Sequence, residues 1–462
     1  MKRFRSPSHF PSICGPGSLS RRAAIQSLVG GSMIYPALLG DLLAEGAADP
    51  LAPRKPHHPA TARSVIFVFS SGGVSHVDSF DPKPELARLA AAGKKLARGE
   101  SRPSPWEFRP GGACGTEVSD LFPEVRNCMD DICLVRSLHT DHSDHSQSTL
   151  QVHTGSFTVP RPSIGSWVSY GLGSENANLP SFVALASQPT YNGPTVWNSN
   201  FLPPIHSALH IRPRQEVANI RPAAPASVQA RELDLLRRLE AAAPADPNPM
   251  VAARARSFEV AAGMQLAVPE LYEIERESPA TRALYGLDEE PTAEFAWQCL
   301  MARRLVERGV RFVEIVDRGS SGNWDQHGNI ERHEPLARAI DRPVAGLLRD
   351  LKGRGMLDDT LVVWISEFGR TPWATGTGRG HHSAVFSAWL AGGGIRGGTV
   401  WGSSDEVGET PADDPVHIHD FHASILHALG FDHERLVHRH NGRDFRLTDV
   451  GGRVVEDWFA RA

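Results

Sequence analysis

Cysteine is scarce in this chain, and its composition offers no basis for nucleic-acid binding or membrane insertion. The 462 residues include five cysteines, and no spacing among them suggests a four-cysteine metal site. Lysine plus arginine number 48 against 53 acidic residues, so the net charge of -5 leaves no basic footprint for nucleic acid. No stretch is apolar and continuous enough for a stable membrane span. Nucleic acid and stable membrane insertion are therefore not expected.

Histidine, glycine and proline are plentiful instead. The 21 histidines occur in clusters, and 42 glycines with 35 prolines indicate many loops between short elements. A chain of this length can bury a large core, as one domain or as a core with a sizeable insertion. Cys128 and Cys133 are near enough in sequence to pair in an exported protein, but buried free thiols are the alternative.

The first 48 residues have the features of an export signal. Arg21 and Arg22 precede a mildly apolar stretch that is interrupted by glycine and proline, and small residues follow near residue 44. This pattern resembles a twin-arginine signal peptide, although a chance arginine pair before a soluble helix is the alternative. We expect residues 1–48 to direct export through the twin-arginine translocase, to the periplasm or the exterior. Residues 49–63 follow as a proline-rich spacer.

Beyond residue 63, continuous apolar runs alternate with helical patterns. Six runs are predicted to be buried strands: 64–69, 132–137, 181–185, 312–316, 361–365 and one that begins at 386. A helical insertion at about 225–307, read as covering helices or a cap, and a crossover helix at 341–351 separate them. The alternation predicts an α/β fold over residues 64–462, with a doubly wound, mostly parallel sheet.

Polar clusters follow the predicted strands, where the carboxyl ends of parallel strands place ligands. The candidate side chains are His76 and Asp78; His139, Asp141, His142, Asp144 and His145; Asp325 and His327; and Glu367, Arg370, His381 and His382, the last two in a Gly- and Pro-rich loop. Imidazole together with carboxylate favours zinc, manganese or iron over calcium or magnesium. No nucleotide cofactor is expected.

Each cluster also has a structural interpretation. Asp325 and His327 could lie in an exposed turn, and residues 139–145 could form a capping loop. The two adjacent histidines, His381 and His382, could divide their roles, one binding a metal and the other orienting it. Glu367 is harder to explain in this way, because a buried carboxylate must be paired or bound. A further histidine run at 417–427 is interpreted as an ordinary helix start, with Asp420 as its N-cap.

At these motifs the chain resembles the exported, sulfatase-like proteins of unknown function (domain of unknown function 1501) in the alkaline phosphatase superfamily. The resemblance covers nearly all of the chain after the leader. It is carried by 73–84, 136–141 with His145, 165–176, Trp324-Asp-Gln-His327, Glu367-Phe-Gly-Arg-Thr-Pro372, His381-His382, 416–430 and 442–446. It implies a doubly wound sheet, one or two metal ions, and a Ser, Thr or formylglycine nucleophile that attacks phosphorus or sulfur.

The resemblance also assigns metal ligands, with departures. Glu367 takes the first position of the superfamily's Asp-His ligand pair, but Phe368 replaces the histidine. Asp325 and His327 resemble the other Asp/His pair at a tighter spacing, and His381 or His382 resembles the late metal-binding histidine. The first strand ends in serine, at 70 or 71, where the superfamily has a ligand aspartate.

The nucleophile departs most from the superfamily pattern. Its position falls near His145, and Ser143 or Ser146 could substitute for it. The chain has no Cys-x-Pro-x-Arg motif, so a formylglycine route is not supported. A histidine at this position could be a covalent nucleophile or a metal ligand.

Together, these observations predict an exported, metal-dependent hydrolase of sulfate or phosphate esters. The expected cofactor is zinc, with manganese second, held by Asp325, His327, Glu367 and His381 or His382. His145 would be nucleophile or general base, oriented by Asp144 or Asp141, and Arg370 would stabilise the oxygens of a small anionic ester or sulfated polysaccharide. His76, Asp78, His139, Asp141 and His142 are additional candidate ligands.

Two other hypotheses remain. The missing first-strand aspartate favours a degenerate superfamily member that binds a polysaccharide or a partner without turnover. A metal-dependent enzyme of another reaction class could also reuse the fold, because fold kinship does not determine function. Convergence of the predicted ligands around one point would favour an active enzyme over the binding protein.

Overall fold

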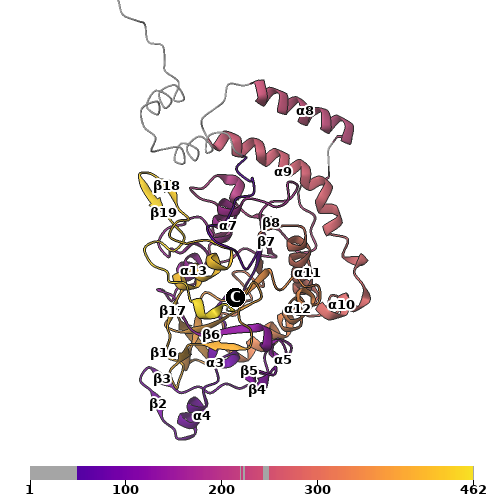
Figure 1. The fold of residues 1–462 in the computed structure, drawn as a ribbon. Coiled ribbons are helices and arrows are strands. Elements are labelled where there is room, and N and C mark those ends of the chain that lie inside the picture. The colour runs from indigo at the N-terminus through magenta and orange to yellow at the C-terminus, as the bar shows by residue number, and fades with distance from the viewer. Residues whose placement is uncertain (1–48, 219, 222–223, 243–248, 461–462) are drawn as a thin grey trace, which may run out of the picture. The chain divides into compact units, whose positions relative to one another are not determined.

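The computed structural model describes residues 49–460, apart from 219, 222–223 and 243–248 (Figure 1). The predicted leader lies outside the described residues. A nine-stranded sheet forms the centre of the described chain, in the order β14-β6-β13-β10-β1-β9-β7-β8, with β17 beside β6. The bounds are β1 Ser64–Phe69, β6 Ile132–His139, β7 Phe182–Ala186, β8 Leu209–Ile211, β9 Phe312–Val316, β10 Thr360–Ile365, β13 Phe386–Ala391, β14 Thr399–Trp401 and β17 Val416–His417.

The sheet is parallel except at one strand. β13 runs antiparallel to both of its neighbours, β10 and β6, and every other pair in the sheet is parallel. This confirms the predicted α/β fold with a mostly parallel sheet. The six predicted strands correspond to β1, β6, β7, β9, β10 and β13, because their long apolar runs suit strands that are buried on both faces.

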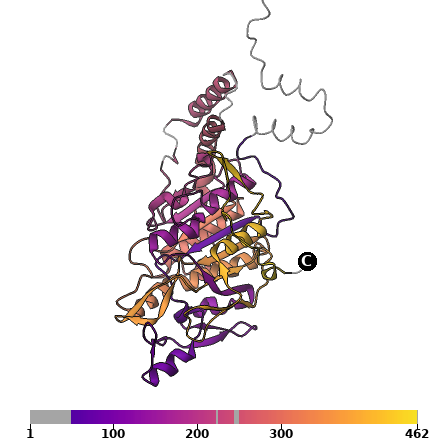
Figure 2. The ribbon, with the colours of Figure 1, turned by 90° about the vertical axis from the view of Figure 1, so that its left-hand side faces the viewer.

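Helices cover both faces of the sheet (Figures 1 and 2). Ile66 and Val68 of β1 pack into one core with α11 (Ala293–Glu307) and α12 (His333–Gly353). Val65, Phe67 and Phe69 alternate with them and pack into a second core with α6 (His145–Thr154), α7 (Ile164–Leu172) and α13 (Ile418–Ala428). The doubly wound arrangement follows from this alternation, since successive strand side chains point to opposite faces.

The structure differs from three local predictions: the start of the crossover helix, the N-cap of α13 and the loop that carries His381 and His382. The crossover helix begins at His333 rather than 341, and Pro343, which would suit a helix start, lies inside it. The N-cap of α13 is His417, with Asp420 at the third helical position of a capping box. The loop expected to carry His381 and His382 is a hairpin of β11 (Gly369–Thr375) and β12 (Gly378–His382).

Residues 226–307 are largely helical, in α8 (Ala226–Ala242), α9 (Pro249–Leu271), α10 (Pro279–Tyr285) and α11. α11 packs on the sheet, whereas Leu236 and Leu239 of α8 are exposed. None of the helices in the described residues combines the length and the apolar composition that a membrane span requires.

The cysteines in the described residues are free thiols. Cys128 belongs to the first core and Cys133 to the second, so the sheet separates the pair that is close in sequence. Burial raises the pKa of each of these two thiols to about 11. Both therefore behave as buried apolar groups, the alternative that the sequence had left open.

One buried charge fixes α6 on the sheet. Glu314, in the middle of β9, is 1% exposed and accepts hydrogen bonds from His153 Nε2 of α6 at 3.1 Å and from Trp197 Nε1 at 2.8 Å. His153 Nδ1 lies 2.7 Å from the carbonyl oxygen of Thr149, so both ring nitrogens donate. Burial opposes a charged imidazole, but Glu314 outweighs it and raises the pKa of His153.

Replacing Glu314 with alanine tests this anchor. The Glu314→Ala variant leaves the His153 charge and the Trp197 N–H buried without their acceptor, so we expect the free energy of unfolding to fall by about 3–5 kcal/mol. Urea denaturation followed by circular dichroism measures the change. Glu100→Ala, which removes an exposed ion pair with Lys95, is the control and should unfold like the unmodified protein. A Glu314→Ala protein as stable as this control would contradict the anchor.

Candidate active site

The candidate site lies where the parallel strands end. His145 is the first residue of α6, which follows β6, and Asp325 lies in the loop after β9. Glu367 comes two residues after the end of β10, and His381 lies on β12 of the hairpin that follows. The carboxyl ends of parallel strands meet at one edge of the sheet, so segments far apart in sequence deliver these side chains to one place.

Three of the predicted residues converge on one point. Asp325 Oδ1 lies 3.3 Å from His145 Nε2 and 3.3 Å from His381 Nε2. These three atoms all lie within 4.8 Å of one another, a spacing that suits one metal ion. His327 Nε2 lies beside them, 3.1 Å from Asp325 Oδ1 and 2.8 Å from His381 Nε2. This His145–Asp325–His381 cluster is the one potential metal-binding group of its kind within the described residues.

Glu367 lies behind His145 rather than in the cluster. Its Oε1 is 2.6 Å from His145 Nδ1, and the backbone N–H of Gly72 donates to both carboxylate oxygens, at 2.8 and 3.0 Å. The side chain is fully buried. A carboxylate that accepts the Nδ1 proton fixes the tautomer and leaves Nε2 free to bind a metal. Glu367 thus has the orienting position that the sequence analysis had given to Asp144 or Asp141.

Arg370 lies against Asp325, and it too is fully buried. Its Nη2 is 2.8 Å from Asp325 Oδ1, its Nε donates to the carbonyl oxygen of Gly73 at 2.8 Å, and Nη2 also donates to that of Gly72. The guanidinium therefore neutralises and positions Asp325. The donors that were expected to face a substrate are directed at protein oxygens.

The charges set the protonation states. Burial alone would lower the pKa of His145, but the adjacent carboxylates of Asp325 and Glu367 outweigh it and raise this pKa to about 8. Burial would raise the pKa of Asp325, yet His145, His381 and Arg370 hold it well below its usual range. The pKa of His327 is lowered, mainly by burial. Asp325 is thus a carboxylate and His327 a neutral imidazole at pH 7.

The other residues proposed from the sequence have partners elsewhere. His382 Nε2 lies 2.8 Å from the carbonyl oxygen of Glu409, and its ring stacks on that of His76 at 5.9 Å. His76 Nε2 lies 3.0 Å from the carbonyl oxygen of Gly408. Asp78 forms a fully buried ion pair with Arg379, at 2.6 Å. These three side chains hold the β11–β12 hairpin and the 405–410 loop in place rather than joining the cluster.

The loop before α6 has a capping role, as its alternative interpretation suggested. Asp144 is the N-cap of α6 and accepts from the backbone of Ser146 and Gln147. His142 Nδ1 accepts from the backbone of Asp144 at 3.1 Å. Asp141 bonds to the side chains of Gln151 and His417, and the ring of His139 lies 5.2 Å from that of His417. Asp144, Asp141, His142 and His139 therefore surround the start of α6 without entering the cluster.

The sequence analysis did not identify Tyr191, and it did not predict that Phe368 would contact His145. The ring of Tyr191 stacks on that of His145 at 4.2 Å and 11°, and Phe368 contacts His145 at 4.8 Å. Tyr191 follows β7, one of the predicted strands, but a lone aromatic residue in a loop carries no chemical signature. Its position after a strand was the one available signal.

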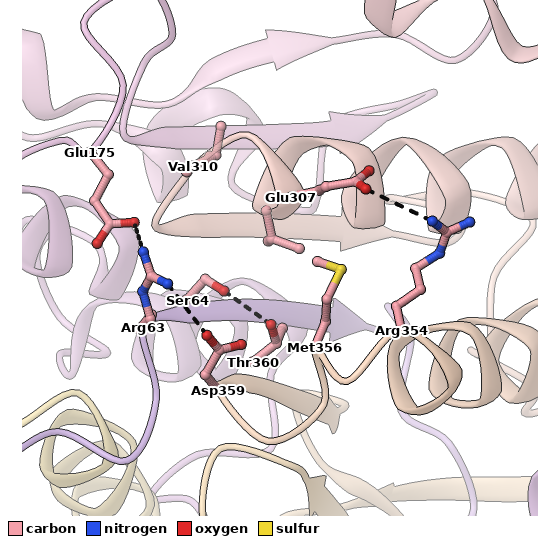
Figure 3. Close-up of a pocket in the computed structure, with 11 residues that line it drawn as sticks. Arg63, Ser64, Glu175, Glu307, Val310, Arg354, Met356, Asp359 and Thr360 are labelled. Carbon is pink, nitrogen blue, oxygen red and sulfur yellow. Dashed lines mark hydrogen bonds and ion pairs between the residues drawn. The ribbon is translucent and has the colours of Figure 1, made fainter.

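A pocket lies at the opposite edge of the sheet (Figure 3). It has a volume of about 490 Å³, and Ser64 and Thr360, which line it, are the first residues of β1 and β10. Its charged side chains are paired: Arg63 lies 3.0 Å from Glu175 and 3.6 Å from Asp359. It is therefore separate from the cluster at the carboxyl ends of these strands.

The chain was also compared with known proteins. A model of the DUF1501 family, proteins of unknown function, matches residues 62–459. None of the curated proteins matches the chain. The sulfatase PsFucS1 from Pseudoalteromonas sp. is 13% identical over 86% of this chain and 70% of its own, with a TM-score of 0.35. A phosphonate monoester hydrolase from Silicibacter pomeroyi is 11% identical over 86% of this chain and 76% of its own, with a TM-score of 0.36. An alkaline phosphatase from the Antarctic bacterium TAB5 is 11% identical over 72% of this chain and 92% of its own, with a TM-score of 0.30. Similarity at this level assigns no activity, so the chemistry has to come from the site.

The donor set fits a divalent transition metal. Two imidazole nitrogens and one carboxylate oxygen converge, with a third imidazole beside them, and zinc favours such ligands. His145 Nε2 is buried and lacks a well-formed hydrogen bond, although Asp325 lies 3.3 Å away. Glu367 supplies the outer carboxylate that commonly supports a metal-binding histidine.

Two adjacent histidines provide a matched test of the ligand set. Plasma mass spectrometry of purified protein should find near-stoichiometric zinc or manganese in the unmodified chain and in His382→Ala. The metal should be absent from His381→Ala, because only His381 belongs to the cluster. Glu367→Gln should weaken affinity by about 10–100-fold, as expected for an orienting carboxylate. Equal loss in His381→Ala and His382→Ala would contradict the assignment.

The raised pKa of His145 predicts a pH dependence of the metal-free protein. Its folded pKa is about 8 and its ordinary value 6.5, so the stabilisation is fully present below pH 6.5 and is lost as the pH rises through 8. The difference corresponds to about 2 kcal/mol. Urea unfolding of chelator-treated protein should therefore lose about this much more stability between pH 6 and 9 than His145→Gln does. Parallel pH profiles for the two proteins would contradict the protonation of His145.

Proposed function

This chain belongs to the DUF1501 family, whose function is unknown, and we propose that it is a metal-dependent hydrolase of sulfate or phosphate esters. The observation that carries the proposal is the His145–Asp325–His381 cluster at the carboxyl edge of the sheet, with Glu367 oriented behind it. Each ligand has a supporting partner: Glu367 for His145, Arg370 for Asp325, and the carbonyl oxygen of Ser143, 2.8 Å from Nδ1, for His381. Such outer partners commonly orient the ligands of catalytic metal ions.

Each residue has a definite task in this proposal. His145 Nε2, Asp325 Oδ1 and His381 Nε2 bind the ion, Glu367 retains the Nδ1 proton of His145, and Arg370 holds Asp325 in place. When bound, a divalent ion such as zinc would supply Lewis acidity to the ester oxygen. His145 is thereby a ligand rather than the covalent nucleophile, because its free nitrogen points into the cluster.

His327 is the proposed general base. Its side chain is 43% exposed, and its lowered pKa keeps it neutral at pH 7, so its unprotonated ring nitrogen can accept a proton from the attacking water. Its Nε2 lies close to Asp325 Oδ1 and His381 Nε2, which places the imidazole beside the proposed metal site.

The proposed substrate is a small anionic ester or a sulfated polysaccharide. Asp325 and His381 are only partly buried, so the cluster is accessible from solvent. Sulfate and phosphate are both tetrahedral oxyanions that the same donors recognise. We further propose that residues 1–48 send the protein through the twin-arginine translocase, which would place this activity in the periplasm or outside the cell.

A binding protein without turnover is the second candidate. The first strand is followed by Ser70 and Ser71, at the place where the superfamily that the chain resembles has a ligand aspartate. Their buried hydroxyls have no hydrogen-bond partner among the described residues. The loss of a carboxylate at this position lowers the number of anionic ligands and favours binding over catalysis. Activity and metal content, measured on the same protein, separate the two candidates.

Activity can be tested with chromogenic sulfate and phosphate monoesters. We expect zinc- or manganese-loaded protein to hydrolyse at least one of them, and His327→Gln to lose about 100–10,000-fold in kcat, as expected for removal of a general base. His382→Ala is the control and should retain activity, since it lies outside the cluster. Stoichiometric metal without hydrolysis of either ester would contradict the hydrolase and favour the binding protein.

A further inference from the structure

Tyr191 lies over the metal-binding cluster. It follows β7, and its ring is nearly parallel to that of His145, with the ring centres 4.2 Å apart. The side chain is partly exposed, as are those of Asp325 and His381. The proposed mechanism gives the phenol of Tyr191 no role.

The hydrogen bonds of Asn323 show which role the Tyr191 hydroxyl has in its contact with this residue. Asn323 Oδ1 accepts from the backbone N–H of Asp325 at 3.1 Å, which fixes the orientation of the amide. Its Nδ2 then donates to the carbonyl oxygen of Gly319 and to the hydroxyl oxygen of Tyr191, both at 2.8 Å. Tyr191 is therefore the acceptor in this bond. Its own proton has no acceptor within the part of the chain that the structure describes.

The phenol is a donor at neutral pH, because a tyrosine hydroxyl ordinarily keeps its proton there. Arg370, by contrast, directs its donors at Gly72, Gly73 and Asp325. The site thus contains a fixed, neutral donor with a free proton, and its guanidinium is already committed to protein oxygens.

We propose that the Tyr191 O–H donates a hydrogen bond to an oxygen of the substrate's sulfate or phosphate group while that group lies at the His145–Asp325–His381 cluster. This assignment depends on the proposed function. It makes Tyr191 a substrate-binding residue, and Asn323 the positioning residue that joins it to Asp325. The stacked ring additionally limits the rotation of His145.

The Tyr191→Phe variant tests the assignment, because it retains the ring and removes only the O–H. Calorimetry on zinc-loaded protein, freed of excess metal, would measure the binding of inorganic phosphate and of sulfate. We expect zinc content to be unchanged and the affinity for at least one anion to fall about tenfold or more, as for a lost hydrogen bond to a charged group. Tyr272→Phe, which removes an O–H bonded to the carbonyl oxygen of Gln215, is the matched control.

Each outcome decides between the hypotheses. Anion binding by the unmodified protein that is weakened in Tyr191→Phe and not in Tyr272→Phe supports the assignment. Equal binding by all three proteins overturns it and leaves the proposed hydrolase standing. Loss of zinc from Tyr191→Phe shows that Tyr191 acts through His145, and overturns its role as a substrate ligand. Failure of the zinc-loaded, unmodified protein to bind either anion overturns both proposals.

Discussion

The buried carboxylate of Glu367 is the constraint on which the site depends. A carboxylate without exposure has to be compensated by hydrogen bonds or opposite charge, and Glu367 obtains both from Gly72 and His145. Gly72 is itself confined: its φ is +111°, and an added Cβ would come within 2.7 Å of Asn323 and of the backbone nitrogen of Asp325. One carboxylate therefore connects the end of β10, the loop after β1 and the start of α6.

The sequence predicts the sheet well and the site only in part. The strands were recognisable because long apolar runs suit strands buried on both faces, and Asp325, His145 and Glu367 could be located because each lies beyond one of them. The choice between His381 and His382 could not be made. Both lie on a hairpin that was expected to be a loop, and successive strand residues face opposite sides. Partners far apart in sequence, such as Asp78 and Arg379, leave no local pattern.

The charges around the cluster indicate how a bound metal ion would change the net charge of the site. Asp325 and Glu367 are opposed by Arg370 and, when it is protonated, by His145, so the metal-free site is close to neutral. Binding of a divalent ion requires His145 to give up its extra proton. The exchange replaces one positive charge with two and leaves the site net positive. The proposed anionic ester would then be attracted by the site as a whole, which suits a cluster in which Arg370 is buried.

The wide separation of the ligands along the chain has a further consequence. His145 is far from Asp325 and His381 in the sequence, and the three meet only once the intervening strands have assembled. An ion held there would act as a reversible cross-link in a chain whose described cysteines form no disulfide. Closing so long a loop in an unfolded chain is entropically costly, so metal capture would report on completed assembly. Metal binding at this site would then mark the completion of folding, in addition to serving the proposed reaction.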